Sequence, residues 1–349
     1  MAKLFTTTVA LATLVAGSAT ADETVDTRIG ELTFQSGYPS QQTVDKLYDE
    51  MDFQRACQAY MWGIPAVGIN EWRKAHFDVF KAKNGEMLSY LDFAEKLGIL
   101  TPNYTTPYVG TFIDLQESGP IVIEIPPGLM AGMILDSWQR VLADLGVVGP
   151  DKGKGGKYLI LPPGHAKVAP KGYYVVESPS RTVLGAVRLL GADKEKAIAE
   201  LIPGIKTYTW SPKGTGTVMP VRRAGDKKWS QMPPRGMAYW ESLNEVIQRE
   251  PVMERDRLIL AQLRFLDIEK DKPSSLTNAK RIFSNRRWWS AKPWPRRTLP
   301  TSVWSRRSGP VRTGSTRWSS PSTSGCRITI SSTSGPRGST KPSSSRRAC

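Results

Sequence analysis

The spacing of apolar residues predicts that the folded part of the chain starts with helices. From residue 43, apolar side chains recur at approximately helical spacing, at positions Val44, Leu47, Met51, Ala56 and Tyr60. Pro65 is expected to stop or kink this helix, because proline lacks the backbone N–H that a helix interior uses. Further helical stretches are predicted at residues 71–80 and 91–97, whereas the polar residues 22–42 are expected to form an extended arm.

After residue 101 the pattern changes to short runs of β-branched and apolar residues. The predicted strands are residues 108–115, 121–125, 133–138, 158–161, 173–177 and 182–190. Turn signals such as Pro-Pro-Gly at 126–128 and 162–164 separate some of them. Short strands at this spacing favour an antiparallel sandwich or barrel over alternating βαβ units.

Helical patterns return after the strands. Asp193 is expected to cap a helix that runs to about residue 201. Residues 211–235 are rich in Gly and Pro and are expected to form a linker. Two helices are then predicted at residues 237–249 and 254–266, with Pro251 between them. We interpret this pair as the start of a second domain.

The charge distribution divides the chain near residue 285. The 349 residues hold 48 Lys and Arg against 32 Asp and Glu, a net charge of +16 that suggests a nucleic-acid-binding protein. However, residues 286–349 contain twelve Arg, two Lys and no acidic residue, whereas residues 1–285 are close to neutral, with 34 basic and 32 acidic side chains. The excess charge therefore belongs to a tail, and we expect no nucleic-acid partner.

The tail has the composition of a sequence translated in an altered reading frame. If synonymous codons are assigned to it and read from the third base, the stretch from Arg287 can encode VVVGEAMAKAN, and residues 314–343 can encode EYALVVPVDLGMQNYDQLDERASWFYEAV. Both strings resemble globular sequence, whereas the tail itself has no helical or strand periodicity. We interpret residues 286–349 as a frameshift product with the break near Asn285, and expect them to be disordered.

The N-terminus has the features of a secretory signal peptide. Lys3 precedes a short apolar and Thr-rich run over residues 4–17, and Ala-Thr-Ala at 19–21 fits the small-residue cleavage pattern before Asp22. The run is shorter than the roughly 20 residues that span a bilayer. We therefore expect a periplasmic or secreted protein without membrane insertion after signal removal. Cys57 is the one cysteine before the tail, so no internal disulfide is expected there.

Several motifs resemble those of a bacterial family defined by domain of unknown function 1254, usually followed by domain of unknown function 1214. The motifs are AYMWGIP (59–65), TPNYTTP (101–107), GPIVIEIP (119–126), ILDSW (134–138), GPDKGKGGKYLILPPG (149–164), PRGMAYWE (234–241) and QREP (248–251). The resemblance covers about residues 43–285, and YDQLDERASWFYEAV in the alternative frame looks like the start of the second domain. The resemblance implies a jelly-roll-like sandwich for each domain and export in many members. It is also compatible with a homo-oligomer, and it implies no settled catalytic residues.

The predicted fold is mainly β: a jelly-roll-like antiparallel β-sandwich with N-terminal helices, then the truncated helical start of a second domain and a disordered tail. The expected segments are a signal peptide (1–21), an extended arm (22–42), the sandwich domain (43–210), a linker (211–235), the truncated second domain (236–285) and the frameshift product (286–349).

An aromatic and amide cluster is the main candidate for a small-molecule site. Rings with a polar handle suit an apolar cleft with a few oriented hydrogen bonds. The residues are Tyr60, Trp62, Asn103, Tyr104, Tyr108, Asp136 and Trp138. The alternative, which these residue types favour, is structural: Trp62 and Trp138 fill the core, and Asn103 makes a turn before the first strand.

The glycine-rich loop over residues 149–157 is a second candidate. Lys152, Lys154 and Lys157 could meet an anionic group there. The loop lacks the Gly-Lys-Ser/Thr ending of a phosphate loop and precedes a strand where that loop needs a helix. An ordinary turn leading into a strand is therefore the alternative, although loops on a sandwich often carry the binding site.

Catalytic chemistry has weaker support. A metal-independent hydrolase would need paired carboxylates such as Asp136 with Asp151. Ser137 has no Gly-x-Ser-x-Gly context for a nucleophile. His76 and His165 are the two histidines, so we expect neither a metal nor another cofactor. The sequence favours an exported module that binds a small or envelope-derived ligand, with the hydrolase as the alternative.

Overall fold

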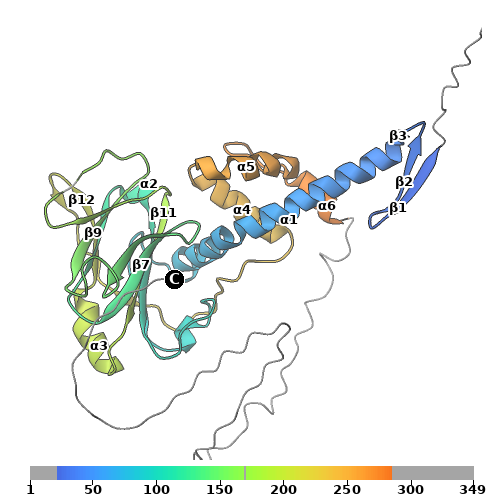
Figure 1. Cartoon of the computed structure of the whole chain (residues 1–349). Coiled ribbons are helices and arrows are strands. Elements are labelled where there is room, and N and C mark those ends of the chain that lie inside the picture. Colours follow the sequence, from blue (N-terminus) through green and yellow to red (C-terminus); the bar gives the residue numbers. More distant parts are fainter. Residues whose placement is uncertain (1–21, 169, 285–349) are drawn as a thin grey trace, which may run out of the picture. The chain divides into compact units, whose positions relative to one another are not determined.

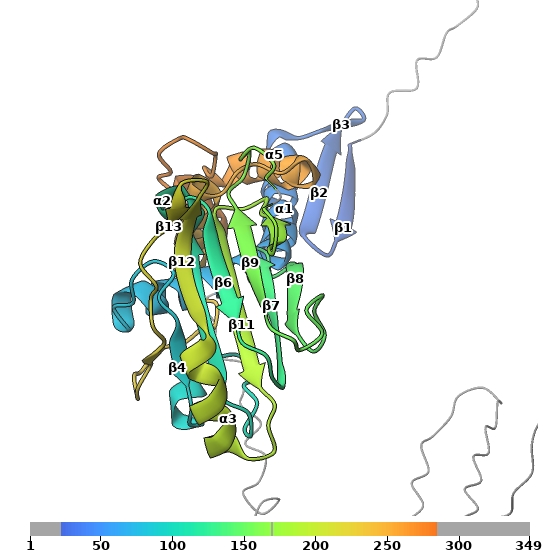
Figure 2. The same cartoon turned by 90° about the vertical axis from the view of Figure 1, so that its left-hand side faces the viewer.

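Two β-sheets stacked face to face form the middle of the chain in the computed structural model, which describes residues 22–168 and 170–284 (Figure 1, Figure 2). Within these residues the larger sheet has the order β14-β4-β5-β11-β7-β8, and the smaller has the order β10-β9-β6-β12-β13. The larger sheet contains β4 (Leu88–Tyr90), β5 (Tyr108–Asp114), β7 (Met130–Asp136), β8 (Val141–Gly146), β11 (Thr182–Leu189) and β14 (Arg222–Arg223). The smaller sheet contains β6 (Ile121–Ile125), β9 (Gly156–Leu161), β10 (Tyr174–Glu177), β12 (Lys206–Ser211) and β13 (Gly214–Thr215).

The core between the sheets follows from the alternation of side chains along each strand. Val183 and Val187 of β11 are buried against Ile123 of β6 and Ile160 of β9 in one hydrophobic cluster. The residues that alternate with them, Leu184, Ala186 and Arg188, therefore lie on the outer face of the larger sheet. The predicted β-sandwich with a helical N-terminal cover is confirmed. Most strand pairs are antiparallel, whereas β9 with β10 and β4 with β14 are parallel.

The long helix α1 (Gln41–Lys74) is the main N-terminal element. It begins after Ser40, whose hydroxyl accepts a hydrogen bond from the Thr43 backbone N–H at 3.2 Å. Pro65 does not stop the helix, which was one of the two outcomes predicted for it, because α1 continues through this residue. Ala66 and Val67 just beyond it are fully buried, so packing offsets the missing backbone hydrogen bond. The stretch predicted at 71–80 is the end of α1 and the π-helical turn η1 (Ala75–Val79).

Short helices connect the strands. They are η2 (Ala94–Lys96), α2 (Leu115–Ser118), α3 (Lys194–Leu201) and η3 (Ile202–Gly204). Asp193 caps α3 as predicted, because its carboxylate accepts a hydrogen bond from the Lys196 N–H at 3.0 Å. The helix expected at 91–97 is reduced to the single turn of η2.

The segment expected to be an extended arm folds into a small sheet of its own. Strands β1 (Glu23–Thr27), β2 (Gly30–Gln35) and β3 (Tyr38–Pro39) pair antiparallel beside the N-terminal end of α1 (Figure 1). The Thr33 N–H donates to the Thr43 hydroxyl at 2.8 Å, which ties this sheet to α1.

The last described elements pack on α1. They are α4 (Met237–Arg249), η4 (Glu254–Asp256), α5 (Arg257–Leu263), η5 (Arg264–Leu266) and α6 (Thr277–Ser284). Tyr239, Trp240 and Leu243 of α4 are fully buried in a cluster with Ala56 and Ala59 of α1. The described residues belong to one compact unit, so the helices after residue 236 are not a separate body within them.

The predicted linker is part of the sandwich. Its β14 adds to β4 of the larger sheet, and the ring of Trp229 lies 5.7 Å from that of Trp72. The predicted signal peptide (1–21) and the predicted frameshift product (286–349) both lie outside the described residues. None of the helices within the described ranges is long and apolar enough to cross a membrane.

Candidate functional site

An apolar cavity of about 180 Å³ lies on the outer face of the larger sheet. Strand register builds its floor, because residues paired across β5, β11 and β7 share a face. The two rows are Tyr108, Arg188 and Ala131, then Gly110, Ala186 and Met133. Ala186, at the centre of this floor, has only a methyl side chain and therefore leaves space above the sheet.

The end of α1 and a loop enclose this cavity. Trp72 of α1 lines it together with Ile99 and Leu100. The Trp72 indole N–H donates to the Tyr90 hydroxyl at 3.4 Å, and its ring lies 5.7 Å from that of Phe112 at an interplanar angle of 71°. An edge-to-face pair of this kind fixes the position of the indole.

Arg188 places a cation beside the apolar lining. Its guanidinium carbon lies 5.0 Å from the centre of the Tyr108 ring, within cation–π range. The side chain is exposed, and no carboxylate in the described part of the chain lies within ion-pair distance of it. The cavity therefore combines an apolar interior with a positive charge that is open to a ligand.

Lys96 supports the Tyr108 side of the cavity from behind. Its Nζ lies 5.1 Å from the Tyr108 ring centre and donates to the carbonyls of Asn103 and Thr106, each at 2.8 Å. Burial lowers the pKa of the Lys96 amine. Because the N–H groups of Lys96 already donate to these carbonyls, this side chain orders the 103–106 loop and is not available to a ligand.

The predicted aromatic residues lie in different environments. Tyr60 packs on Tyr239 in the core between α1 and α4, with ring centres 4.2 Å apart. Asn103 makes the turn that the structural alternative predicted, because its Oδ1 accepts from the N–H groups of Thr105 and Thr106 at 2.9 Å each. Tyr104 is 75% exposed. Of the predicted cluster, Tyr108 alone lines the cavity above the larger sheet.

The two predicted tryptophans meet each other away from that cavity. The rings of Trp62 and Trp138 lie 5.6 Å apart. They line a space of about 10 Å³ together with Asp256, to which the Trp62 indole donates. A space of this size holds about one water molecule, so the pair packs α1 against the turn after β7 and leaves no room for a larger ligand.

The two carboxylates of the hydrolase alternative hold separate turns. Asp136 is fully buried, accepts from the N–H groups of Trp138 and Arg140 at 2.8 and 3.0 Å, and pairs with the Arg140 guanidinium at 2.5 Å. Asp151 accepts from the Tyr158 hydroxyl at 2.5 Å and from the Gly146 N–H at 2.8 Å. Neither carboxylate lines the cavity, so no observation favours paired general acid/base chemistry here.

The remaining predicted groups have structural partners or stand apart. The Ser137 hydroxyl is buried and donates to the Thr182 carbonyl at 3.3 Å. His76 is buried in η1, whereas His165 is exposed in a turn. Lys154 and Lys157 line a groove beside the smaller sheet, and Lys152 does not. Across the described residues, no three His, Cys, Asp or Glu side chains gather in a way that could hold a metal ion.

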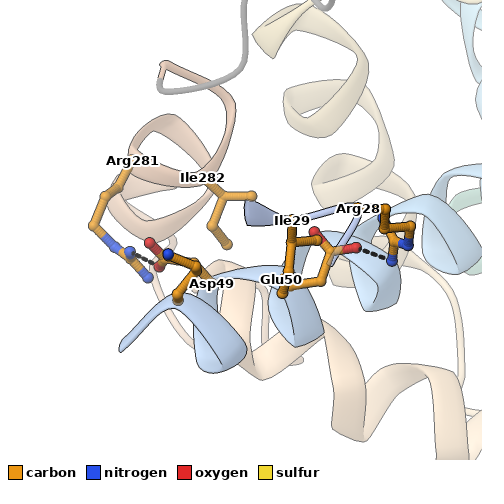
Figure 3. Close-up of a pocket in the computed structure, with 7 residues that line it drawn as sticks. Arg28, Ile29, Asp49, Glu50, Arg281 and Ile282 are labelled. Atoms are coloured by element: carbon orange, nitrogen blue, oxygen red, sulfur yellow. Dashed lines mark hydrogen bonds and ion pairs between the residues drawn. The ribbon is translucent and has the colours of Figure 1, made fainter. Parts of the chain in front are cut away.

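A recess of about 300 Å³ near the N-terminal sheet is lined by charges that pair with one another (Figure 3). Arg28 pairs with Glu50 at 2.5 Å, and Arg281 pairs with Asp49 at 2.6 Å. The view shows these pairs on either side of Ile29 and Ile282. This recess lies between the β1–β2 turn, α1 and α6, and its ion pairs connect these elements.

The sequence pattern missed Arg188 and Trp72 as site residues. Arg188 is the single charged residue in β11, whose sequence is TVLGAVRL. This lone charge in an apolar strand was an available signal. Its neighbours across the sheet could not be read from the sequence, because they depend on strand order and register.

The part of the chain that forms this cavity is similar to a known protein family, and the chain is similar to two solved structures. Residues 87–209 match the family described as "Protein of unknown function (DUF1254)". No curated protein matches the chain. Among solved structures, the chain is similar to the VPA0106 protein from Vibrio parahaemolyticus, with 15% identity over 67% of this chain and 57% of that one and a TM-score of 0.48. An uncharacterised protein from Burkholderia cenocepacia shows 12% identity over 52% of this chain and 46% of that one, with a TM-score of 0.26.

The chain thus spans less than two thirds of the length of either solved protein. The family match extends from the residue before β4 into β12, and therefore includes the three strands that form the cavity floor. In this region the chain is similar to a family whose function is unknown.

Proposed function

We propose that the chain is a binding module for a small ligand with an apolar body and one negatively charged group. The body would occupy the cavity above β5, β7 and β11, and Arg188 would bind the charged group. The observation that carries this proposal is the register that sets the unpaired Arg188 guanidinium beside the apolar lining. Apolar pockets with a few placed polar groups are the usual form of small-molecule sites.

The size of the cavity limits the ligand. An apolar cavity of about 150 Å³ accommodates a benzene-sized molecule, and this one measures about 180 Å³. Tyr108 and Trp72 offer aromatic surface to such a body. An aromatic or short branched monocarboxylate therefore fits both the volume and the charge.

Benzoate and uncharged benzamide are suitable probes, measured by isothermal titration with the full chain. Arg188→Gln should weaken benzoate binding about tenfold, which is the cost of losing one hydrogen bond to a charged group, and should leave benzamide binding unchanged. Ala186→Leu should fill the floor and weaken both. Lys213→Gln, an exposed charge outside the cavity, is the matched control. Benzoate binding that is unchanged in both cavity variants would contradict the proposal.

We also propose that the protein is exported and that residues 1–21 are removed. Support comes from Lys3, the apolar run and the Ala-Thr-Ala site in the sequence. The test is N-terminal sequencing of the protein from the periplasmic fraction of a Gram-negative host. A mature chain that starts at Asp22 is the expected result, and a chain that keeps Met1 in the cytoplasm would contradict it.

For the C-terminal part, we propose that the helices after residue 236 begin a second, 1214-type domain and that residues 286–349 come from an altered reading frame. The absence of acidic residues in the tail and the globular character of the alternative frame support this. Resequencing the gene around the codons for Ser284 to Trp289 is the direct test. A continuous codon phase would refute it.

A further inference from the structure

A lysine-rich groove of about 480 Å³ lies along one end of the smaller sheet. Lys154 comes from the loop before β9, Lys157 from the start of β9, Lys171 from the loop before β10, and Lys206 from the start of β12. Strand register explains why two of these lysines meet. Lys157 and Lys206 are the residues directly opposite Glu124 on the two strands that flank β6, so Glu124 lies between them in the sheet.

The positive charge of the groove is only partly compensated by the protein. Glu124 is the one carboxylate among the residues that line it, and this carboxylate accepts a hydrogen bond from the Tyr208 hydroxyl at 2.7 Å. Burial and the nearby Glu124 raise the pKa of Tyr208, so its hydroxyl keeps the proton that it donates. None of the four lysines forms an ion pair in the described part of the chain. Four ammonium groups around one carboxylate repel one another unless an anion enters.

The groove also has a defined shape. Gly155 has a φ of +80°, and a Cβ at this position would lie 2.7 Å from the Pro127 nitrogen. The backbone turn there accordingly requires glycine, and it brings the chain close to the edge of the groove. On another side, the Tyr173 ring lies 5.9 Å from Lys157 Nζ and 6.3 Å from the Trp210 ring. These contacts hold Lys157 near the groove.

We infer that this groove binds a phosphate group, held by Lys157 and Lys206 and flanked by Lys154 and Lys171. A phosphate monoester or a pyrophosphate carries several oxygen acceptors and more than one negative charge, so several ammonium donors can bind it at once. A monocarboxylate would leave most of the lysine charge uncompensated. The groove lies on the smaller sheet and shares no lining residue with the cavity at Arg188.

The test is a site-resolved one, because residues 286–349 carry fourteen positive charges that would bind anions without specificity. The full chain is acetylated on lysine with and without sodium pyrophosphate, and each peptide is quantified by mass spectrometry. Pyrophosphate should protect Lys157 and Lys206 about tenfold more than the exposed Lys152 and Lys213, neither of which lines the groove. Equal protection of all four would refute the groove as a site.

A pair of variants with matched charge gives a second measurement. Lys157→Gln with Lys206→Gln should weaken pyrophosphate binding by the remaining groove lysines, seen as loss of protection at Lys154 and Lys171. Lys152→Gln with Lys213→Gln removes the same charge elsewhere and should leave that protection intact. Both proteins are first checked for the same circular dichroism spectrum. Unchanged protection in the first variant would overturn the inference.

The phosphate could belong to a soluble compound or to a lipid headgroup, and one further comparison separates these sources. Vesicles of phosphatidylglycerol in phosphatidylcholine are compared with vesicles of phosphatidylcholine alone in the same acetylation assay. Protection by pyrophosphate without vesicles assigns a soluble phosphate, whereas protection by the phosphatidylglycerol vesicles alone assigns a headgroup. Protection in neither arm would contradict the site itself.

Discussion

The indole N–H of Trp62 donates a hydrogen bond of 3.1 Å to the carboxylate of Asp256, which lies 194 residues later in the chain. The bond connects the middle of α1 to η4. Asp256 is 4% exposed and also pairs with the Arg255 guanidinium at 3.3 Å. A carboxylate that is this deeply buried depends on its donors to offset the loss of water.

Trp62→Phe should therefore destabilise the chain. It removes the donor to Asp256 while keeping an aromatic ring, and the expected loss is about 1–3 kcal/mol of unfolding free energy. Urea denaturation followed by circular dichroism measures it. Tyr104→Phe, at an exposed side chain, is the control and should stay within about 0.5 kcal/mol of wild type. A Trp62→Phe protein as stable as this control would show that the bond contributes little.

His76 should make stability depend on pH. Its side chain is buried between Phe77 and Phe112, and desolvation lowers its pKa from 6.5 to about 4. Glu86 acts in the opposite direction, and Arg222 and Arg73 in the same direction, but burial dominates. Because the unfolded chain binds the His76 proton more readily, the stability from neutral His76 is complete above pH 6.5 and is lost as the pH falls towards 4.

The measurement is the urea midpoint at several pH values between 6.5 and 4. The wild-type chain should lose up to about 3 kcal/mol across this window from His76, and His76→Phe should flatten the slope even if it changes the absolute stability. The exposed His165 provides the control, since His165→Gln should keep the wild-type slope. Glu86 has a lowered pKa and loses its contribution below the ordinary carboxyl range, so it does not account for a slope near pH 6. An unchanged slope in His76→Phe would rule out this histidine as the cause.

Asp136→Asn distinguishes a structural carboxylate from a catalytic one. The asparagine amide would direct its N–H donors towards either the backbone N–H groups of Trp138 and Arg140 or the Arg140 side chain, all of which already donate to this position. We expect a loss of about 1–3 kcal/mol of unfolding free energy, because a buried acceptor of several N–H donors is lost, whereas the Arg140 side chain is 37% exposed and stays in contact with water. Asp144→Asn, at an exposed carboxylate on the neighbouring β8, should be nearly neutral. An Asp136→Asn protein with wild-type stability would revive the hydrolase alternative.

The sequence predicted elements whose signals are local. β6 is a mainly apolar run, IVIEI, between Gly-Pro and Pro-Pro, and α4 lies between Gly236 and Pro251, so both have the predicted bounds. β8 was missed because four of its six residues are partly or fully exposed, and its sequence, VLADLG, is not strongly apolar. Pro65 misled the prediction because packing on both sides of it decided the helix, and a local rule does not include that packing.

The site was predicted less well because it depends on register. Tyr60 and Trp62 are two positions apart, yet on a helix they point to different partners, Tyr239 and Trp138. Tyr108 was identified by its residue type, whereas Arg188 joins it through strand pairing across 80 residues. Lys157 and Lys206 likewise meet through β6, which no spacing in the sequence reveals.

An apolar surface along the first half of α1 bears on the proposed second domain. Leu47, Tyr48 and Met51 lie on one side of the helix and are 41%, 60% and 40% exposed. Arg55 continues this side and stacks on Phe265 of η5, which is itself 46% exposed. Further along the helix, residues such as Ala56 and Ala59 are buried in a cluster with α4 and α6. Exposed apolar side chains gathered in this way favour association or aggregation.

A chain with the reading frame restored after Asn285 should therefore be more soluble than this one. Its added domain would follow α6, which already contacts α1 through Arg281 and Asp49, and would cover part of the apolar side of α1. The comparison is soluble yield and thermal unfolding of the two chains expressed from the same vector. Leu47→Gln with Met51→Gln in the present chain should raise its soluble yield, whereas the same change in the restored chain should lower its melting temperature, because there the two residues would be buried. Equal yields and equal unfolding of the present and restored chains would contradict the proposal that a second domain belongs on this surface.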